Sequence, residues 1–280
     1  MLIWPATRFV AGEDKQVAIA AVRELNARGI SASLDLLGEN VTDRAAADRA
    51  RDEYVELLHA IADARVDSNI SIKLTMLGLD IGTGLARDHL VSILETARET
   101  DNWVRIDMEG SRYTQLTLEI FYAVWETYRN VGVVIQTMLR RSEADVDRLI
   151  GIGARVRLVK GAYKEPAPLA YQDKAEVNAA FDRLAERLLE KGDFPAIATH
   201  DDERIEHTIE HARKRSIERD RFEFQMLYGV RRETQEELVR RGCRMRVYVP
   251  YGDLWFPYFY RRLRERKENV TFVLRNVLRR

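Results

Sequence analysis

A short aromatic and basic segment near the C-terminus has the residue types of a carboxylate-binding site. It reads Tyr258-x-x-Arg261-Arg262-x-x-Glu265 and falls in a stretch that we expect to be helical. Arginine presents a planar fork of N–H donors that binds a carboxylate through two parallel hydrogen bonds. Glu265 follows the two arginines by about one helical turn, so it can hold both guanidinium groups. An isolated arginine pair is more often a solvated helix face, so the interpretation depends on what the rest of the chain places beside it.

The composition indicates a soluble protein with a large core. The 280 residues are 46% hydrophobic and 32% charged, and the formal net charge is zero. Such a balance gives no overall field to attract nucleic acid or an anionic membrane. No apolar run approaches the ~20 residues that cross a bilayer, and the N-terminus lacks the pattern of a secretory signal. The single cysteine, Cys243, excludes an intrachain disulfide and fits a reducing compartment. We expect a cytoplasmic protein, at most peripherally associated with a membrane, that binds no nucleic acid.

Short β-branched apolar runs alternate with longer segments of helical periodicity along the chain. This alternation indicates parallel strands joined by helical crossovers. After a leading helix at about residues 14–27, the runs predict one (βα)8 TIM-barrel domain over residues 1–280, an α/β fold. The runs cover residues 31–37, 70–75, 103–109, 131–137, 154–160, 195–200, 222–227 and 243–249.

A doubly wound open sheet is the competing architecture. Its glycine fingerprint is missing after the first predicted strand. The nearest match, Gly82-Thr83-Gly84, follows the second run and has Arg87 where the third glycine belongs. We therefore favour the barrel.

The C-terminal ends of the predicted strands carry polar side chains where apolar ones would pack better. In a barrel these ends converge on the face that holds active sites, and burying a charge is costly. Each residue alone has a structural explanation: Arg105 could pair with Asp107, residues 199–201 could cap a helix, and Gln225 could satisfy a carbonyl. As a ring they indicate a functional site. The ring comprises Lys73, Arg105, Asp107, Gln136, Arg157, Lys160, Thr199, His200, Gln225 and Tyr248.

The composition of this ring favours binding of phosphate and carboxylate groups and stabilisation of a cofactor anion. It has several cations, one central carboxylate and no nucleophilic Ser or Cys arrangement, since Cys243 begins the eighth run. A metal site is not predicted. His207-x-x-Glu210-His211 matches the H-x-x-E-H pattern, but it falls on an outer helix without an evident third ligand. We interpret it as a solvated helix face.

Ordered motifs run from about residue 6 to the C-terminus. They are SLDLLGE, SIKLTMLGLD, VRIDMEGS, VVIQTMLR, VRLVKGAYKEP, ATHD, FEFQMLYGVR and YVPYGDLWFPYFYRRLRER. Together they resemble the bacterial monofunctional proline dehydrogenases, the FAD-dependent proline oxidase family. The resemblance implies a distorted (βα)8 barrel with a C-terminal helix covering the active-site face. It also implies oxidation of L-proline to Δ1-pyrroline-5-carboxylate by hydride transfer to flavin N5, the first step of proline catabolism to glutamate. Electrons would pass to a quinone carried in a membrane, and a pyrroline-5-carboxylate dehydrogenase would act downstream.

The resemblance assigns roles to individual residues. It implies that Arg261 and Arg262 bind the proline carboxylate together with Lys73 and Glu265, and that Tyr163, Leu227 and Tyr248 surround the proline ring. Tyrosine at position 248 implies a preference for proline over hydroxyproline. The implied catalytic set is Asp107, Arg157, Lys73 and Tyr248. The implied FAD contacts are Arg105, Met108, Gln136, Arg157, Lys160, Gly161, Ala162, Thr199, His200 and Gln225.

Two other classes of function stay open at the level of sequence. A strand-end lysine, Lys73 or Lys160, could form a Schiff base in a barrel lyase. Alternatively, the aromatic and basic C-terminal segment could be a surface for nucleic acid or lipid, although zero net charge argues against it.

Overall fold

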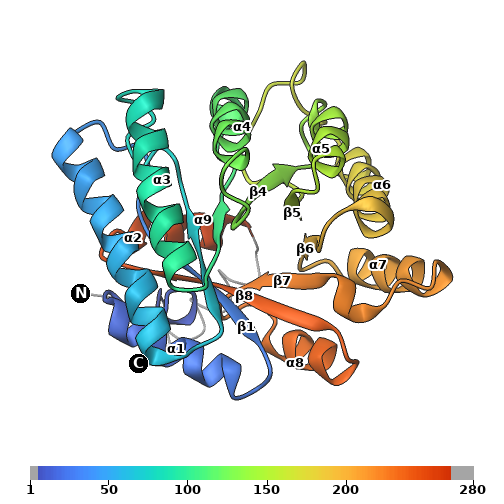
Figure 1. Cartoon of the computed structure of the whole chain (residues 1–280). Coiled ribbons are helices and arrows are strands. Elements are labelled where there is room, and N and C mark those ends of the chain that lie inside the picture. The colour runs from blue at the N-terminus through green and yellow to red at the C-terminus, as the bar shows by residue number, and fades with distance from the viewer. Residues whose placement is uncertain (1–5, 266–280) are drawn as a thin grey trace.

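The computed structural model of the chain describes residues 6–265, with side chains through Tyr260. Eight parallel strands close into a barrel in sequence order, β1 next to β2 through to β8 beside β1, and helices surround it (Figure 1). The predicted (βα)8 barrel is confirmed. The strands are β1 (Ser31–Leu36), β2 (Ser68–Ile72), β3 (Val104–Ile106), β4 (Val131–Gln136), β5 (Arg155–Val159), β6 (Ala196–Ala198), β7 (Glu223–Leu227) and β8 (Arg244–Tyr251).

Helices follow the strands in the order that the sequence periodicity predicts. They are α1 (Lys15–Asn26), α2 (Arg44–Ala64), α3 (Thr83–Glu99), α4 (Ser111–Trp125), α5 (Ser142–Gly151), α6 (Lys174–Lys191), α7 (Asp202–Lys214), α8 (Arg232–Arg240) and α9 (Trp255–Glu265), with short 3-10 turns η1 (Ala6–Arg8) and η2 (Arg219–Arg221). The leading helix, predicted at about residues 14–27, is α1. Within residues 6–265 no helix is both long and apolar enough to span a membrane.

Side-chain caps fix where several helices begin. Asp14, Asp43 and Asp173 have extended backbones, and each carboxylate accepts hydrogen bonds from backbone N–H groups of the first turn of α1, α2 or α6. These N–H groups have no partner inside the helix, so a capping carboxylate satisfies them and complements the helix dipole. The apolar face of each helix then packs on the barrel; in α6, Phe181 and Leu184 are buried.

Two strands are shorter than predicted. The runs 103–109 and 195–200 yield only three-residue strands, β3 and β6. Beyond them Asp107 and Thr199 still donate a backbone N–H to Ile72 and Gln225. The next residues turn toward the loops of the C-terminal end. The polar side chains at these positions therefore stand on the rim of the barrel, just after the strands.

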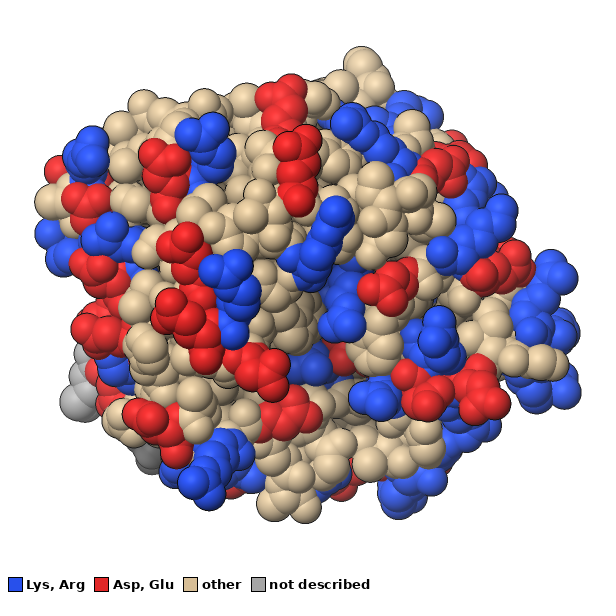
Figure 2. Space-filling model, viewed as in Figure 1, with Lys and Arg blue, Asp and Glu red and all other residues tan. Residues whose placement is uncertain are grey.

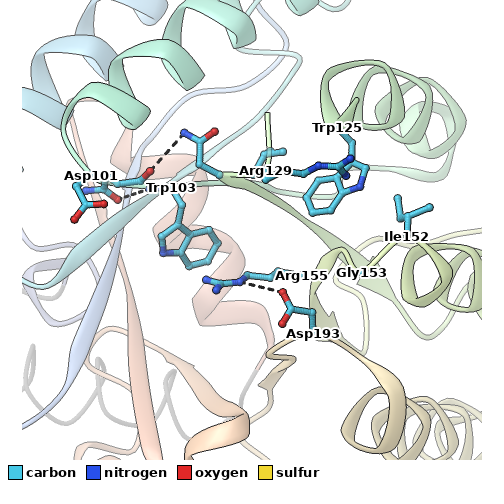
Figure 3. A pocket seen from close by; sticks show the side chains of 11 residues that line it. Asp101, Trp103, Trp125, Arg129, Ile152, Gly153, Arg155 and Asp193 are labelled. Atoms are coloured by element: carbon cyan, nitrogen blue, oxygen red, sulfur yellow. Dashed lines mark hydrogen bonds and ion pairs between the residues drawn. The ribbon is translucent and has the colours of Figure 1, made fainter. Parts of the chain in front are cut away.

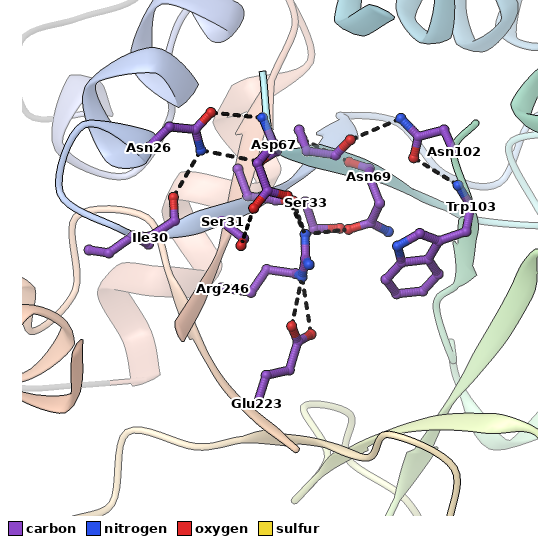
Figure 4. Close-up of polar contacts among 12 residues, drawn as sticks. Asn26, Ile30, Ser31, Ser33, Asp67, Asn69, Asn102, Trp103, Glu223 and Arg246 are labelled. Carbon is purple, nitrogen blue, oxygen red and sulfur yellow. Dashed lines mark hydrogen bonds and ion pairs between the residues drawn. The ribbon is translucent and has the colours of Figure 1, made fainter. Parts of the chain in front are cut away.

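The interior of the barrel holds charges in its N-terminal half. The Arg246 guanidinium donates to both carboxylate oxygens of Glu223 at 3.1 and 3.0 Å and to Ala32 O at 2.7 Å, as Figure 4 shows in part. The side chain of Arg105 is 1% exposed and donates to Arg155 O at 2.7 Å. Gly132 makes room for it, because a Cβ there would lie 2.6 Å from Arg105 Nη1.

A cavity of about 580 Å³ lies at the N-terminal end of the barrel. Trp103 and Trp125 line it, together with Arg155, which pairs with Asp193 at 3.5 Å (Figure 3). On the face shown in Figure 2, acidic and basic side chains are interspersed, in keeping with the zero net charge.

Helix α9 belongs to the opposite end. Its Trp255 and Phe259 pack in a small cluster with Phe9, Val10 and Leu37, separate from the main core. The rings of Phe9 and Phe259 are 6.2 Å apart. This contact ties α9 to the segment before α1 and brings Tyr258 to the cavity described next.

Candidate active site

A cavity of about 910 Å³ lies at the C-terminal mouth of the barrel. It is the point where the ends of the strands converge, as expected for a barrel enzyme. The predicted site residues that line it are Lys73, Asp107, Met108, Gln136, Arg157, Lys160, Gly161, Ala162, Tyr163, Thr199, His200, Gln225, Leu227 and Tyr248. The structure therefore brings these predicted residues together around one cavity.

Asp107 is the centre of the polar network in this cavity. Its two oxygens have different partners: Arg157 Nη1 lies 2.8 Å from Oδ1, and the Tyr248 hydroxyl donates to Oδ2 at 2.7 Å. Arg157 also donates to Ser71 Oγ at 3.0 Å and lies over the Tyr248 ring at 5.4 Å. Burial and the Asp107 carboxylate raise the pKa of Tyr248, so its hydroxyl stays a donor. The arrangement fixes a carboxylate, a guanidinium and a phenol around one point.

Lys73 enters the same network from the end of β2. Its ammonium lies 2.6 Å from Asp35 Oδ1, 3.4 Å from the Tyr248 hydroxyl and 4.0 Å from Asp107 Oδ2. Burial acts to lower the pKa of Lys73, but the Asp35 and Asp107 carboxylates outweigh it and raise the pKa above its ordinary value. A Schiff-base lysine must be a neutral amine, so this geometry disfavours the lyase reading of Lys73.

Among the acidic residues that line the cavity and were not predicted as site residues, Asp35 and Glu109 are buried. Asp35, at the end of β1, has its side chain only 1% exposed, and burial raises its pKa to about 6. Glu109 accepts from Thr75, both the hydroxyl at 2.5 Å and the backbone N–H at 3.2 Å, and burial raises its pKa as well. The sequence did contain a signal for Asp35, because it is the lone carboxylate in the run SLDLL. This was the one predicted strand to which no polar end residue was assigned.

The outer edge of the cavity carries Lys160 and Arg231, each paired with an aspartate that also lines the cavity, Asp201 or Asp202. Lys160 pairs with Asp201 at 2.6 Å and donates to Asn178 at 2.6 Å. Burial acts to raise the pKa of Asp201, but hydrogen bonds and nearby positive charge, chiefly those of Lys160, together outweigh burial, so the pKa of Asp201 is lowered. Arg231, not predicted, donates to His200 O at 2.7 Å and has a left-handed backbone with φ of 54°. This edge can meet the negative charge of a phosphate.

The structural explanations considered for single residues are partly correct. Asp201 does cap α7, because its carboxylate accepts from Glu203 N. Its neighbour His200 nevertheless lines the cavity, and its Nε2 accepts from Leu227 N at 2.9 Å. Gln225 donates to the Glu223 side chain, not to a carbonyl as considered. Asp201 itself both caps α7 and lines the cavity.

Arg105 is a correction. It was predicted at the mouth, among the cofactor contacts, but its side chain does not line the cavity. Its guanidinium donates to Val133 O and Arg155 O and lies 4.6 Å from the Trp103 ring, toward the N-terminal end. It does not pair with Asp107, whose cation is Arg157. Residues 105 and 107 are two positions apart, so side chains at both point to the same face of a strand, here the inside of the barrel. This spacing could not show that Arg105 lies nearer the N-terminal end than Asp107.

The carboxylate-binding motif lies partly outside the described residues. The backbone of α9 continues to Glu265, as predicted for this helix. The side chains of Arg261, Arg262 and Glu265 lie beyond those described.

The H-x-x-E-H segment lies on α7, as predicted, on the outside of the barrel. His207 Nε2 is 2.8 Å from Glu186, and His211 Nε2 is 3.0 Å from Glu190, both on α6. Across the described part of the chain, no group of three His, Cys, Asp or Glu side chains could hold a metal ion. The histidines link two neighbouring helices.

Comparison with known proteins shows the family of the chain. The family model described as proline dehydrogenase matches residues 18–275. The chain belongs to the proline dehydrogenase family. It is 42% identical over 274 residues to proline dehydrogenase 1 of Bacillus subtilis subsp. natto, covering 98% of this chain and 91% of that one. It is 38% identical over 279 residues to proline dehydrogenase of Deinococcus radiodurans, with 98% and 90% covered.

Longer proteins share the same barrel. A crystal structure of proline utilization A from Bdellovibrio bacteriovorus, inactivated by N-propargylglycine, superposes with a TM-score of 0.86 at 30% identity. The match covers 92% of this chain and 32% of that one, so this chain spans about a third of that protein. Membership of the family makes the chain an oxidoreductase of proline catabolism.

Proposed function

We propose that this chain oxidises L-proline to Δ1-pyrroline-5-carboxylate with FAD bound in the cavity at the C-terminal mouth. The observation that carries the proposal is the network of Lys73, Asp107, Arg157 and Tyr248 facing one cavity. The edge of this cavity offers N–H donors from Lys160 and Arg231. Family membership supports the reaction class.

The lining residues fit a dinucleotide cofactor. The cavity volume of about 910 Å³ is within the range of roughly 300–1,000 Å³ that ligand sites occupy. Lys160 and Arg231 on its edge suit the pyrophosphate, and Gln136 and His200 offer polar contacts beside them. Nε of Arg157 is buried and has no hydrogen-bond partner within residues 6–260, which leaves a donor for a bound group. The family-implied contacts Met108, Gly161, Ala162, Thr199 and Gln225 lie in the same lining.

When bound, FAD would supply the acceptor for the hydride that leaves proline C5. The protein's own residues bind and orient the substrate. Lys73, with Arg261 and Arg262, holds the proline carboxylate, while Tyr163, Leu227 and Tyr248 confine the ring. Asp107 fixes Arg157 and Tyr248 relative to each other, so the wall of the site is rigid.

The charge around the substrate amine is more balanced than the sequence implies. A surplus of cations would favour the neutral amine, because nearby positive charge lowers the pKa of an ammonium group. Lys73, however, has the Asp35 carboxylate at 2.6 Å, and Asp107 neutralises Arg157. We therefore infer that the substrate amine loses its proton mainly through bulk pH, and that the rate rises with pH.

The electron acceptor that best fits the family is a quinone. We propose a cytoplasmic protein that meets a membrane-borne quinone only transiently, and a separate pyrroline-5-carboxylate dehydrogenase that consumes the product. Tyr248 at the ring wall supports a preference for proline over hydroxyproline.

Anaerobic addition of L-proline to the purified yellow protein tests the proposal. We expect the visible absorbance of the oxidised flavin to bleach with L-proline, and far less with D-proline or trans-4-hydroxy-L-proline. Full flavin content with no bleaching by L-proline would rule the reaction out.

A further inference from the structure

Asp35 has no role in the network proposed so far, although it touches one of its members. It lies at the end of β1, where its carboxylate is 2.6 Å from the Lys73 ammonium. Its other oxygen, Oδ2, is buried and has no hydrogen-bond partner within residues 6–260. A carboxylate buried in this way is expensive unless its charge is used.

Lys73 has two carboxylates within reach, and they compete for it. Asp35 holds it at 2.6 Å, while Asp107 lies 4.0 Å away. Asp107 already uses Oδ1 for Arg157 and Oδ2 for the Tyr248 hydroxyl. If Lys73 moved onto Asp107, it would compete with both of these bonds.

We propose that Asp35 is a positioning residue of the substrate site: it retains Lys73 at β2 and thereby leaves Asp107 free to hold Arg157 and Tyr248. The inference rests on the proposed function, because it assigns Asp35 a part in proline binding and oxidation. It adds a residue of β1 to a site otherwise built from later strands.

The surroundings of Asp35 make its charge sensitive to pH. The groups that face it are Lys73 on the β2 side, Asp107 after β3, Tyr248 and Tyr251 on β8, and Tyr54 on α2. Burial raises the pKa of Asp35 to about 6, with Lys73 acting in the opposite direction. Above this pH the carboxylate is charged and offsets Lys73. Below it Asp35 is neutral, so the site gains one positive charge.

A ligand without a titrating amine separates this effect from substrate protonation. Tetrahydrofuran-2-carboxylate has the shape of proline but an ether oxygen in place of the amine. Its affinity for the holoenzyme can be followed by the change in flavin absorbance between pH 5 and 8. In the wild-type protein we expect binding to tighten as pH falls through about 6, because a neutral Asp35 leaves Lys73 more attractive to an anion.

The variant Asp35→Asn should remove this dependence. At pH 7.5 we expect it to bind the analogue as tightly as the wild type or up to about tenfold more tightly, since a buried negative charge is gone. The rate of flavin reduction by saturating L-proline should fall about tenfold, because Lys73 then competes for Asp107.

A matched control removes a buried, paired carboxylate elsewhere. Asp145 on α5 is 9% exposed, accepts from Arg141 at 2.7 Å and is not part of the cavity lining. Asp145→Asn should leave both the pH dependence and the reduction rate unchanged. The inference is overturned if Asp35→Asn keeps the wild-type bend near pH 6, or if its analogue affinity and its rate fall together. A wild-type protein that L-proline does not reduce would instead overturn the proposed function.

Discussion

The two ends of the barrel contain similar residues and use them differently. At the N-terminal end, Arg246 meets both oxygens of Glu223, and Arg105 meets two backbone carbonyls. At the C-terminal mouth, Arg157 and Lys73 also have carboxylate partners, but they face a cavity of about 910 Å³. Charge inside a barrel is therefore not by itself evidence of a site. What distinguishes the mouth is charge that lines a cavity large enough for a ligand.

The largest effect is expected at the mouth. Arg157→Met should lower kcat/KM for L-proline by about 10² to 10³, the usual loss when one preorganised electrostatic donor is removed. The substitution also removes the guanidinium that lies 2.8 Å from Asp107 Oδ1 in the intact protein. Steady-state kinetics on protein with matched FAD content measures the loss. A change of less than threefold would show that Arg157 acts only in packing.

The corresponding change at the other end should affect stability alone. Arg246→Met strands the buried Glu223 carboxylate, which is 3% exposed, and should reduce the free energy of unfolding by about 3–5 kcal/mol. The folded fraction should keep its kcat/KM within about twofold of wild type. Denaturant unfolding and kinetics on the same sample test both statements. Reduced kcat/KM without loss of stability would mean that the two ends are functionally coupled.

A backbone change at the mouth should weaken cofactor retention. Gly161 has φ of 118°, and a Cβ there would lie 2.4 Å from Met138 Sδ. The strain of Gly161→Ala, of order 1–3 kcal/mol, should raise the FAD dissociation constant about tenfold. Gly151→Ala is the matched control, because a Cβ at position 151 meets nothing within 4 Å. Equal FAD affinity of the two variants would argue that residues 160–162 do not hold the cofactor.

Removing one hydroxyl from the network should have a modest effect. Tyr248→Phe loses the 2.7 Å bond to Asp107, a contribution of about 1 kcal/mol, so kcat/KM should fall about fivefold. The same variant should lose little stability, since the ring still packs against Arg157. A loss above a hundredfold would give the hydroxyl a direct chemical role.

The smallest effect is expected on the outer surface. His207→Gln removes a half-exposed contact with Glu186 and should change the free energy of unfolding by less than about 1 kcal/mol. Activity and zinc content of the purified protein should not change. Loss of bound metal in the variant would revive the H-x-x-E-H motif as a site.

The sequence was sufficient for the fold because the alternation of strand-length and helix-length runs is a local signal. It located the mouth because polar residues interrupt apolar runs there, as at Lys73 and Asp107. It could not separate layers within the barrel, so Arg105 was assigned one layer too high. It also missed Asp35, because a carboxylate next to leucines in the first strand reads as an ordinary exposed residue until Lys73 is placed beside it.

The contrast between the two ends is tested most directly by single-turnover flavin reduction in a matched pair of variants. Asp107→Asn at the mouth and Glu223→Gln at the N-terminal end each replace a carboxylate that pairs with an arginine. With L-proline under anaerobic conditions, we expect the rate constant of Asp107→Asn to fall at least about a hundredfold and that of Glu223→Gln to stay within about twofold. The reverse ranking, or equal losses in both variants, would contradict the placement of the chemistry at the C-terminal mouth.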